Sequence, residues 1–473
     1  MQAGHALLVL CFLGFLKEFR PSESFLTMYL VGTKNFSKDQ VSQEIYPIGT
    51  YSTLLLLLVI FLITDLARYK PVIIVQSLAG VVCYSLITFC ASLEYVQAAE
   101  VFYGLFLASE VAYSTYMYAS TEKEFYQKVT SYTRIALQSG RLVSGVVGQV
   151  LISCELLNFH ELNFLSLAGL SLSAVFGCLL PSAHRSLYFR CEQNEVSSIT
   201  SADFPPGCNN DTNPGPSADT NLLQDVDKSV SGDAVQCKLD SGSKSNEILR
   251  SEQHLSGFKK IQRDFLFAFS NVYIIKWSLW WSLTHCGYLQ VTSYVQNLWQ
   301  DTIDLNGGQL YNGFASATYT LLGIAASWVA GRLKFDFDGS KCQWLLSTCA
   351  FLSGALVIFS TMSQTLYYQY VAYGAFKILY QIMMIVANTE VAKSLARDSH
   401  GLIFGFNTFA ALILQTILTV TVTGKGGLQL SIRHQFFVYG GYFVVMGCGF
   451  GISELSKIIS LRLSHQNSKK GPP

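Results

Sequence analysis

The chain has 473 residues, half of them hydrophobic, and carries only 32 Lys and Arg and 31 Asp and Glu. Charged residues make up 13% of the sequence, whereas a soluble domain usually contains about 25%. The formal net charge of +1 excludes the strongly basic surface with which many proteins bind nucleic acid. We therefore expect a membrane protein that embeds in the lipid bilayer and has no nucleic-acid partner.

Motifs for nucleotide hydrolysis and for metal binding are absent from the sequence. The 12 cysteines include no CxxC pair, the 8 histidines have no HExxH spacing, and there is no GxxxxGK[ST] loop. We expect neither an enzyme nor an ATP-driven pump, and we expect no cofactor and no bound metal.

Runs of about 20 apolar residues, enough for one helix to cross a bilayer, recur along the chain. In chain order they predict six spans, a polar stretch and six further spans. The first six are residues 5–30, 47–65, 71–92, 96–120, 130–154 and 161–181. The last six are residues 270–297, 311–332, 343–362, 366–391, 401–424 and 434–458.

Residues 182–265 separate the two sets of spans and hold a third of the charged residues. This stretch is rich in Ser, Asp, Asn, Gly and Pro, so it cannot bury enough apolar surface to fold and is predicted to be a disordered cytoplasmic linker. The arrangement predicts an all-α membrane protein, a major facilitator-type bundle of twelve transmembrane helices in two six-helix halves. The predicted parts are an N-terminal half at 1–181, the linker at 182–265, a C-terminal half at 266–458 and a cytoplasmic tail at 459–473.

Basic residues in the short loops set the expected orientation. Loops on one side of the predicted topology carry Lys123, Arg332 and Lys393, among others. Basic loops face the cytoplasm, so we expect both termini there. The first loop then lies outside the cell, and its Asn35-Phe36-Ser37 sequon predicts a glycoprotein modified at Asn35.

Charged side chains within spans are the main candidate sites, because each is costly in a bilayer unless it faces a cavity or a partner. They are Glu18, Arg20 and Glu23 in the first span, Glu110 in the fourth, Arg141 in the fifth and Lys377 in the tenth. The alternative for each is a fixed ion pair that braces the helices.

The fourth span combines aromatic and acidic side chains. Tyr103, Glu110, Tyr113 and Met117 are separated by seven, three and four residues, which places them on one face of a helix. Aromatic rings attract an organic cation, and a carboxylate neutralises its charge. This face is therefore predicted to bind a cationic solute.

Two basic residues have alternative roles at this stage. Lys377 either pairs with Glu110 or meets an anionic group of the solute. Arg141, beside the small residues Ser139, Gly140 and Ser144, either pairs with a carboxylate or admits an anionic substituent.

Several longer strings identify a family. They are Arg20-Pro21-Ser22-Glu23, Glu44-Ile45-Tyr46-Pro47, Thr64-Asp65 followed by Arg68-Tyr69-Lys70-Pro71-Val72, Trp277-Ser278-Leu279-Trp280-Trp281, Tyr311-Asn312-Gly313 and Phe404-Gly405-Phe406-Asn407-Thr408-Phe409. Together they resemble the vertebrate folate and thiamine transporter family, the reduced folate carrier family, over nearly all of the chain except the linker and the tail. The resemblance implies a plasma-membrane secondary transporter that moves a water-soluble vitamin without ATP, by alternating access.

Within this resemblance, three features favour thiamine. Glu110 precedes Val111-Ala112-Tyr113 as in thiamine members, Gln415 stands where the folate carrier has a lysine, and Ser22-Glu23 has the thiamine form. The resemblance implies that Glu23, Glu110 and Tyr113 bind the cation. The alternatives are a carrier of folate or thiamine phosphates that uses Lys377 and Arg141, and a receptor without transport activity.

Other positions depart from the thiamine members. Gly49 stands in place of a tryptophan, Ser293 of an asparagine, Ser316 of a glutamate and Arg141 of an aromatic residue. The replacements at Ser316 and Arg141 make the local charge more positive, which opposes the binding of a cation. A further expectation is proton coupling through Glu110 or Glu23, with uptake that rises with external pH.

Overall fold

A computed structural model of the chain describes residues 2–67, 69–119, 125–181, 269–306, 309–332, 339–393, 400–424 and 426–469, together with 262, 263 and 266. The described helices belong to one compact unit, formed by Met1–His184 with Phe265–Pro473. Most of the predicted linker at 182–265 lies outside the described residues, so its disorder stays a prediction.

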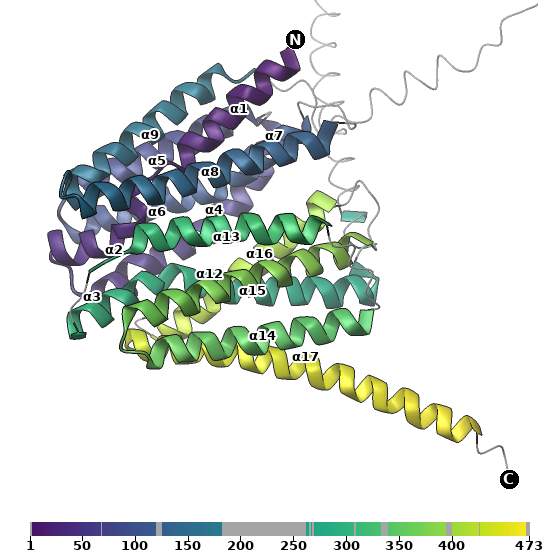
Figure 1. Ribbon diagram of the computed structural model, residues 1–473. Helices are drawn as coiled ribbons and strands as arrows, with labels where there is room; N and C mark the ends of the chain where they lie inside the picture. The colour runs from purple at the N-terminus through teal and green to yellow at the C-terminus, as the bar shows by residue number, and fades with distance from the viewer. Residues whose placement is uncertain are drawn as a thin grey trace, which may run out of the picture. The chain divides into compact units, whose positions relative to one another are not determined.

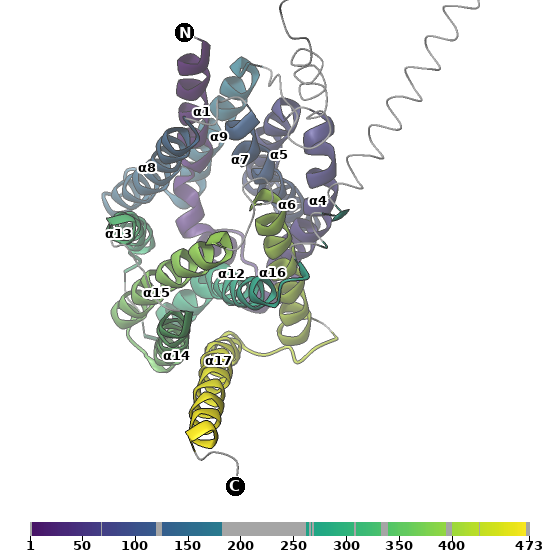
Figure 2. The ribbon, with the colours of Figure 1, turned by 90° about the vertical axis from the view of Figure 1, so that its right-hand side faces the viewer.

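The described ranges are helical and contain no β-strand. The elements before the linker are α1 (Gln2–Glu18), η1 (Pro21–Phe25), α2 (Leu26–Met28), η2 (Tyr29–Thr33), α3 (Lys38–Gln40), η3 (Val41–Ile45), α4 (Tyr46–Leu66), α5 (Lys70–Phe89), α6 (Leu93–Ala108), α7 (Glu110–Ala119), α8 (Tyr126–Ser153) and α9 (Phe159–Leu179). The elements after it are α12 (Val272–Asn306), α13 (Asn312–Arg332), α14 (Gly339–Met362), α15 (Leu366–Lys393), α16 (His400–Val422) and α17 (Ile432–Lys469). In both ribbon views, the helices up to α9 form one group and those from α12 onward a second group beside it (Figures 1 and 2).

Within the described residues, eight helical segments are long and apolar enough to cross a membrane. They are Lys38–Thr64, Lys70–Phe89, Lys128–Ser153, Phe159–Leu179, Ser340–Met362, Leu366–Val391, Ile403–Val422 and Ile432–Ser460. The four predicted spans outside this set, at 5–30, 96–120, 270–297 and 311–332, are helical, but they are either broken or rich in polar side chains. Twelve membrane crossings therefore stay a prediction.

The first predicted span is broken where α1 meets η1. Pro21 has no backbone N–H and its ring clashes with the preceding turn, so an α-helix cannot run through it unchanged. The backbone N–H of Arg20, just before the proline, donates to the Glu18 carbonyl at 3.0 Å and to Ser144 Oγ on α8 at 3.0 Å. The Ser22 hydroxyl lies 2.8 Å from that of Ser166 on α9. These contacts hold a short non-α segment inside the helix group and present its charged side chains to the interior.

Two further boundaries differ from the sequence prediction. The predicted fourth span is divided at Ser109 into α6 and α7. At the other end of the chain, α17 continues to Lys469, so the predicted tail at 459–473 is helical over most of its length.

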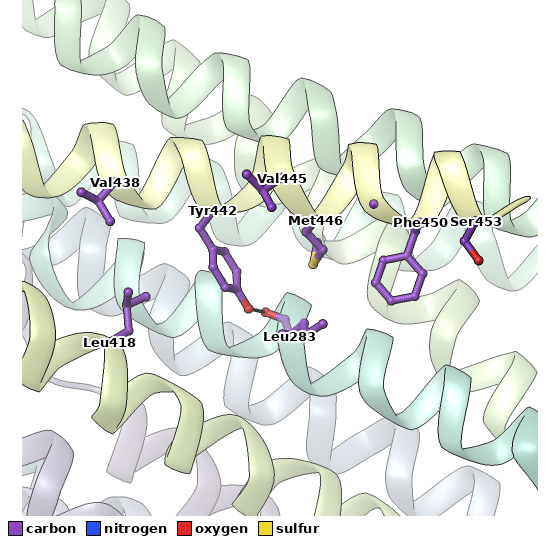
Figure 3. Close-up of a pocket in the computed structure, with 9 residues that line it drawn as sticks. Leu283, Leu418, Val438, Tyr442, Val445, Met446, Phe450 and Ser453 are labelled. Atoms are coloured by element: carbon purple, nitrogen blue, oxygen red, sulfur yellow. Dashed lines mark hydrogen bonds between the residues drawn. The ribbon is translucent and has the colours of Figure 1, made fainter. Parts of the chain in front are cut away.

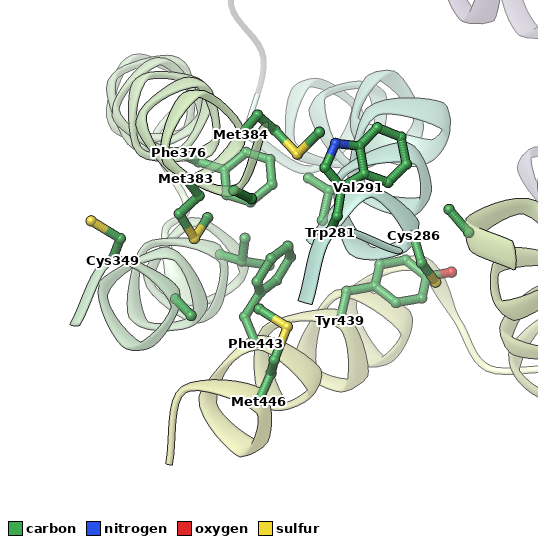
Figure 4. Packing of buried hydrophobic residues seen from close by; sticks show 14 of the residues in the cluster. Trp281, Cys286, Val291, Cys349, Phe376, Met383, Met384, Tyr439, Phe443 and Met446 are labelled. Atoms are coloured by element: carbon green, nitrogen blue, oxygen red, sulfur yellow. The ribbon is translucent and has the colours of Figure 1, made fainter. Parts of the chain in front are cut away.

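Aromatic and sulfur-containing side chains fill the core of the second helix group. Phe376 on α15 meets Phe443 on α17 edge to face, with ring centroids 5.4 Å apart and an interplanar angle of 78°. Met383, Met384 and Met446 pack around this pair (Figure 4). Flexible thioether side chains fill the irregular gaps between rigid rings.

The two helix groups meet through small residues and through a polar cluster. A methyl group on Gly145 of α8 would lie 2.6 Å from the carbonyl oxygen of Gly313 on α13, so only glycine permits this approach. At the same end, Lys38 on α3 pairs with Asp304 on α12 at 2.7 Å and with Asp301 at 3.4 Å. These contacts close one end of the space between the groups.

Candidate functional site

A cavity of about 820 Å³ lies between the two helix groups. Its walls come from α1, η1, α4, α6, α7 and α8 on one side and from α12, α13, α15 and α16 on the other. A second hollow of about 620 Å³ lies on α12, α16 and α17, where its lining is apolar apart from Tyr442 and Ser453 (Figure 3). The titratable side chains gather in the first cavity, which is therefore the candidate functional site.

Four charged side chains form a linked ion-pair network around the Pro21 break. Both oxygens of Glu18 accept from Arg141, at 2.8 Å from Nε and 3.1 Å from Nη2. Arg20 lies 3.4 Å from Glu18 and 3.0 Å from Glu23, and the Tyr103 hydroxyl donates to Glu23 at 3.1 Å. Glu18 and Arg20 are buried, so each depends on its partners to offset the loss of water.

A second ion pair joins α1 to α7. Lys17 is 0% exposed and donates to the Glu110 carboxylate, whose side chain is 42% exposed to the cavity. Gln76 on α5 also donates to Glu110 at 2.7 Å. The Lys17 ammonium lies 3.8 Å from the centroid of the Tyr113 ring. Glu110 therefore has a permanent internal cation beside it.

Glu100 on α6 differs from the other cavity acids. It is 6% exposed, lines the cavity, and its carboxylate has no hydrogen-bond or ion-pair partner among the described residues. A methyl group on Gly49 of α4 would collide with its Oε2, so the glycine provides the space that this carboxylate occupies. Tyr103 follows one helical turn later on the same element.

The opposite wall, on α12, α13 and α15, is aromatic and basic. The rings of Tyr288 and Tyr380 stack at 3.7 Å with an interplanar angle of 9°, and His285 Nδ1 lies 2.7 Å from the Tyr380 hydroxyl. The Lys377 ammonium lies 5.3 Å from the ring centroid of Tyr373 and 5.9 Å from those of Tyr288 and Tyr319. Among the described residues, Lys377 pairs with no carboxylate.

The structure brings most of the predicted site residues together. Glu23, Tyr103, Glu110, Arg141 and Lys377 all line the cavity. The positions that depart from thiamine members, namely Gly49, Ser293 and Ser316, line it as well. Lys377 does not pair with Glu110, because Lys17 occupies that position.

Tyr113 and Met117 are not among the cavity-lining residues, contrary to the expectation of one exposed face. Both are buried, and the Tyr113 hydroxyl donates to the Leu10 carbonyl of α1 at 3.1 Å. Met117 Sδ accepts from Thr133 on α8 at 2.8 Å. The expectation assumed one uninterrupted helix, whereas the chain breaks at Ser109 and α1 and α8 cover this face of α7.

Sequence reasoning missed Glu100, Tyr288 and Tyr319. Glu100 lies inside the predicted span at 96–120, so it carried the same signal as Glu110. The two tyrosines had no comparable signal, since 25 tyrosines are spread along the chain.

Asn35 of the predicted sequon is exposed and has a left-handed backbone with φ of 58°. It precedes a capping box in which Ser37 and Gln40 bond each other's backbone N–H groups. Exposure is necessary for glycosylation, and the modification itself stays a prediction.

Solved membrane transporters have the same fold. The chain aligns with the POT family transporter PepTSo at a TM-score of 0.64, over 96% of this chain and 98% of that one, with 12% sequence identity. It aligns with the nucleoside transporter NupG at a TM-score of 0.56, over 95% and 99% of the two chains, with 13% identity. These similarities define the class, an all-α membrane protein with the major facilitator-type fold, as predicted.

The chain belongs to the reduced folate carrier family, whose model matches residues 4–438. It is 34% identical to thiamine transporter 1 of Mus musculus, over 98% of this chain and 92% of that protein. It is 33% identical to thiamine transporter 2 of Homo sapiens, over 93% and 87% of the two chains. It is 32% identical to the human reduced folate transporter, over 93% of this chain and 70% of that protein.

Proposed function

We propose that this protein transports thiamine or a related organic cation across the plasma membrane by alternating access of the central cavity. The relatives reported above are transporters rather than enzymes, and their names include both thiamine and folate. Family membership supports transport of a vitamin, and the charges of the cavity support the choice among vitamins.

The observation that carries the proposal is the unpaired carboxylate of Glu100 in an aromatic cavity. A lone charge in a low-dielectric site is costly until a cation neutralises it. Tyr103 lies on the same element, and Tyr84 also lines the cavity. A flat cation gains both charge neutralisation and ring contact there.

The Glu100 carboxylate also supports coupling of transport to a proton. A buried carboxylate without a counter-ion is stabilised either by a proton or by a cationic ligand. We propose that the cation replaces a proton on Glu100, so that uptake rises with external pH. Glu23 and Glu110, the two acids expected from sequence, are already paired with Arg20 and Lys17.

The orientation belongs to the same proposal. We place the end that carries Asn35 and the Lys38 ion pairs outside the cell, with both termini in the cytoplasm. The sequon and the basic loops of the opposite side support this placement.

Folate is the second candidate, because Lys377 has no acidic partner and lies in an aromatic wall. A folate dianion would use Lys377 and Arg141 and would leave Glu100 without a cation. Competition by folate against labelled thiamine separates the two candidates.

The direct test is uptake of radiolabelled thiamine by cells that express the protein. Wild-type uptake should be saturable, and Glu100→Gln should lower it about tenfold to hundredfold, because a charge-assisted contact is worth about 1.5–3 kcal/mol. Glu94→Gln is the matched control, since Glu94 lies exposed on the same helix. Normal uptake by Glu100→Gln at normal surface expression would contradict the assigned site.

A further inference from the structure

The hollow of about 620 Å³ on α12, α16 and α17 lies apart from the central cavity (Figure 3). Helix α17 packs against α14 and α12, whereas α16 packs against α12 and α4, so the space between α16 and α17 is left open. We call this space the α16–α17 groove. Both helices contain segments long and apolar enough to cross a membrane. The bilayer is therefore the source of whatever fills the groove.

The groove residues of α17 form one stripe along that helix. Val438, Tyr442, Val445, Gly449 and Ser453 follow one another at intervals of four, three, four and four residues, which places them on one face. The stripe is about 22 Å long at the rise of an α-helix, whereas one leaflet of hydrocarbon is about 15 Å thick. It is therefore long enough to accompany an acyl chain through one leaflet.

The stripe is open and apolar between its ends. Val445 is 72% exposed, and a methyl group on Gly449 would meet no atom within 4 Å. The Tyr442 hydroxyl already donates to the Leu283 carbonyl of α12 at 2.8 Å, so this tyrosine presents only its ring to the groove (Figure 3). Such a lining favours a hydrocarbon chain over a polar ligand.

A cation lies on the same face where the groove ends. Lys457 follows Ser453 by four residues, and its side chain is 60% exposed. A helix needs about 20 residues to cross the hydrocarbon, and α17 begins at Ile432, so the hydrocarbon ends near Gly451. Ser453 and Lys457 therefore lie at the level of the lipid headgroups.

The neighbouring acid does not cancel this cation. Glu454 is 2% exposed, accepts a hydrogen bond from Ser340 Oγ, and lies 3.9 Å from both Lys276 and Lys457. Two lysines thus share one buried carboxylate, while Lys457 keeps most of its surface in solvent. The result is a surplus of one positive charge at the mouth of the groove, which attracts an anionic headgroup.

We propose that the α16–α17 groove binds one anionic phospholipid, with an acyl chain along the stripe and the headgroup phosphate at Lys457. The order along α17, from an apolar stripe through Ser453 to a cation, matches the order of chain, backbone and phosphate in such a lipid. In the orientation proposed above, this end of α17 faces the cytoplasm, and the cytoplasmic leaflet holds the anionic phospholipids. The site is separate from the transported solute.

The test uses the full chain purified in detergent, titrated with palmitoyl-oleoyl phosphatidylserine and followed by native mass spectrometry. Wild type should bind one phosphatidylserine per chain, with an affinity about fivefold higher than for phosphatidylcholine, which is the contribution of one lysine at a membrane surface. Gly449→Leu should lower the affinity for both lipids at least tenfold, because the new side chain fills the groove. Gly441→Leu is the matched control, since Gly441 lies on the same helix, also has no atom within 4 Å, and is not among the groove-lining residues.

The headgroup contact is tested separately. Lys457→Gln should abolish the preference for phosphatidylserine and change the affinity for phosphatidylcholine less than twofold. Lys341→Gln should retain the preference, because Lys341 is exposed beside Ser340 at the same end of the helices and lies outside the groove.

Equal affinities of wild type for the two lipids would overturn the inference, as would a Gly449→Leu variant that binds phosphatidylserine as wild type does. A change in oligomeric state of Gly449→Leu without a change in lipid binding would also overturn it, since the groove would then belong to a second copy of the chain. These results are independent of thiamine uptake, so they stand whether or not the proposed function holds.

Discussion

The Lys17–Glu110 pair predicts an unequal response to the loss of its two partners. Lys17 is 0% exposed, whereas the Glu110 side chain is 42% exposed and also accepts from Gln76. Glu110→Gln leaves an ammonium buried without its counter-ion. Lys17→Met leaves a carboxylate that keeps one hydrogen bond and reaches cavity water. We expect Glu110→Gln to be the more destabilising change.

The magnitudes follow from burial. Removal of one partner from a buried pair costs about 3–5 kcal/mol of stability. In Glu110→Gln, Lys17 keeps its contact with the Tyr113 ring, which offsets about 1 kcal/mol of that cost. Glu110→Gln should therefore cost about 2–4 kcal/mol of stability. Lys17→Met should cost about 1 kcal/mol, because the exposed carboxylate remains hydrated. The double variant, which removes both charges, should be close to wild type.

The assay is thermal unfolding of the purified protein in detergent, followed by intrinsic tryptophan fluorescence. The rank order of apparent Tm should be wild type and the double variant highest, then Lys17→Met, then Glu110→Gln. The double variant should also retain uptake if the pair serves to brace α1 against α7 and Glu100, rather than Glu110, binds the substrate. A double variant no more stable than Glu110→Gln would refute this reasoning. A stable double variant without uptake would indicate that Glu110 binds the substrate.

Three further predictions test other parts of the structure. Gly49→Ala should lower uptake about tenfold, because its methyl group would displace the Glu100 carboxylate, whereas Gly32→Ala, which meets no atom within 4 Å, should leave uptake unchanged. Lys38→Met should remove ion pairs worth about 1 kcal/mol at the closed end and widen the distance distribution between spin labels at Asp39 and Leu305; an unchanged distribution would show that the pairs do not hold this end. Asn35→Gln should abolish a glycosidase-sensitive shift in gel mobility, and persistence of the shift would assign it to another site.

Hydropathy predicted where most of the helices lie, because a helix that crosses the bilayer needs a run of about 20 mainly apolar residues. It was least effective for the predicted spans at 5–30, 96–120, 270–297 and 311–332, which are broken or polar. All four segments line the cavity, but so do α4, α8, α15 and α16, which are apolar enough to be among the eight. The polar side chains of the cavity therefore weaken the hydropathy signal in some of its helices and leave it intact in others.

The partners of the charged residues could not be predicted from the sequence. Lys17 and Glu110 are 93 positions apart, and Glu18 and Arg141 are 123 apart, so only the packing of α1 against α7 and α8 brings them together. Sequence analysis found charges within spans, but the distinction between Glu110, which is paired, and Glu100, which is not, depends on that packing. The same packing removed Tyr113 from the predicted binding face.

The placement of the two unpaired charges connects binding to transport. A ligand held at Glu100 alone would contact one helix group and would gain little from closure of the cavity. A ligand that also reaches Lys377 contacts both groups, so its binding becomes more favourable as the groups approach each other. A ligand shifts a conformational equilibrium only by its difference in affinity for the two states. Charges on opposite walls supply that difference, and neutralising either one should therefore slow translocation more than it weakens initial binding.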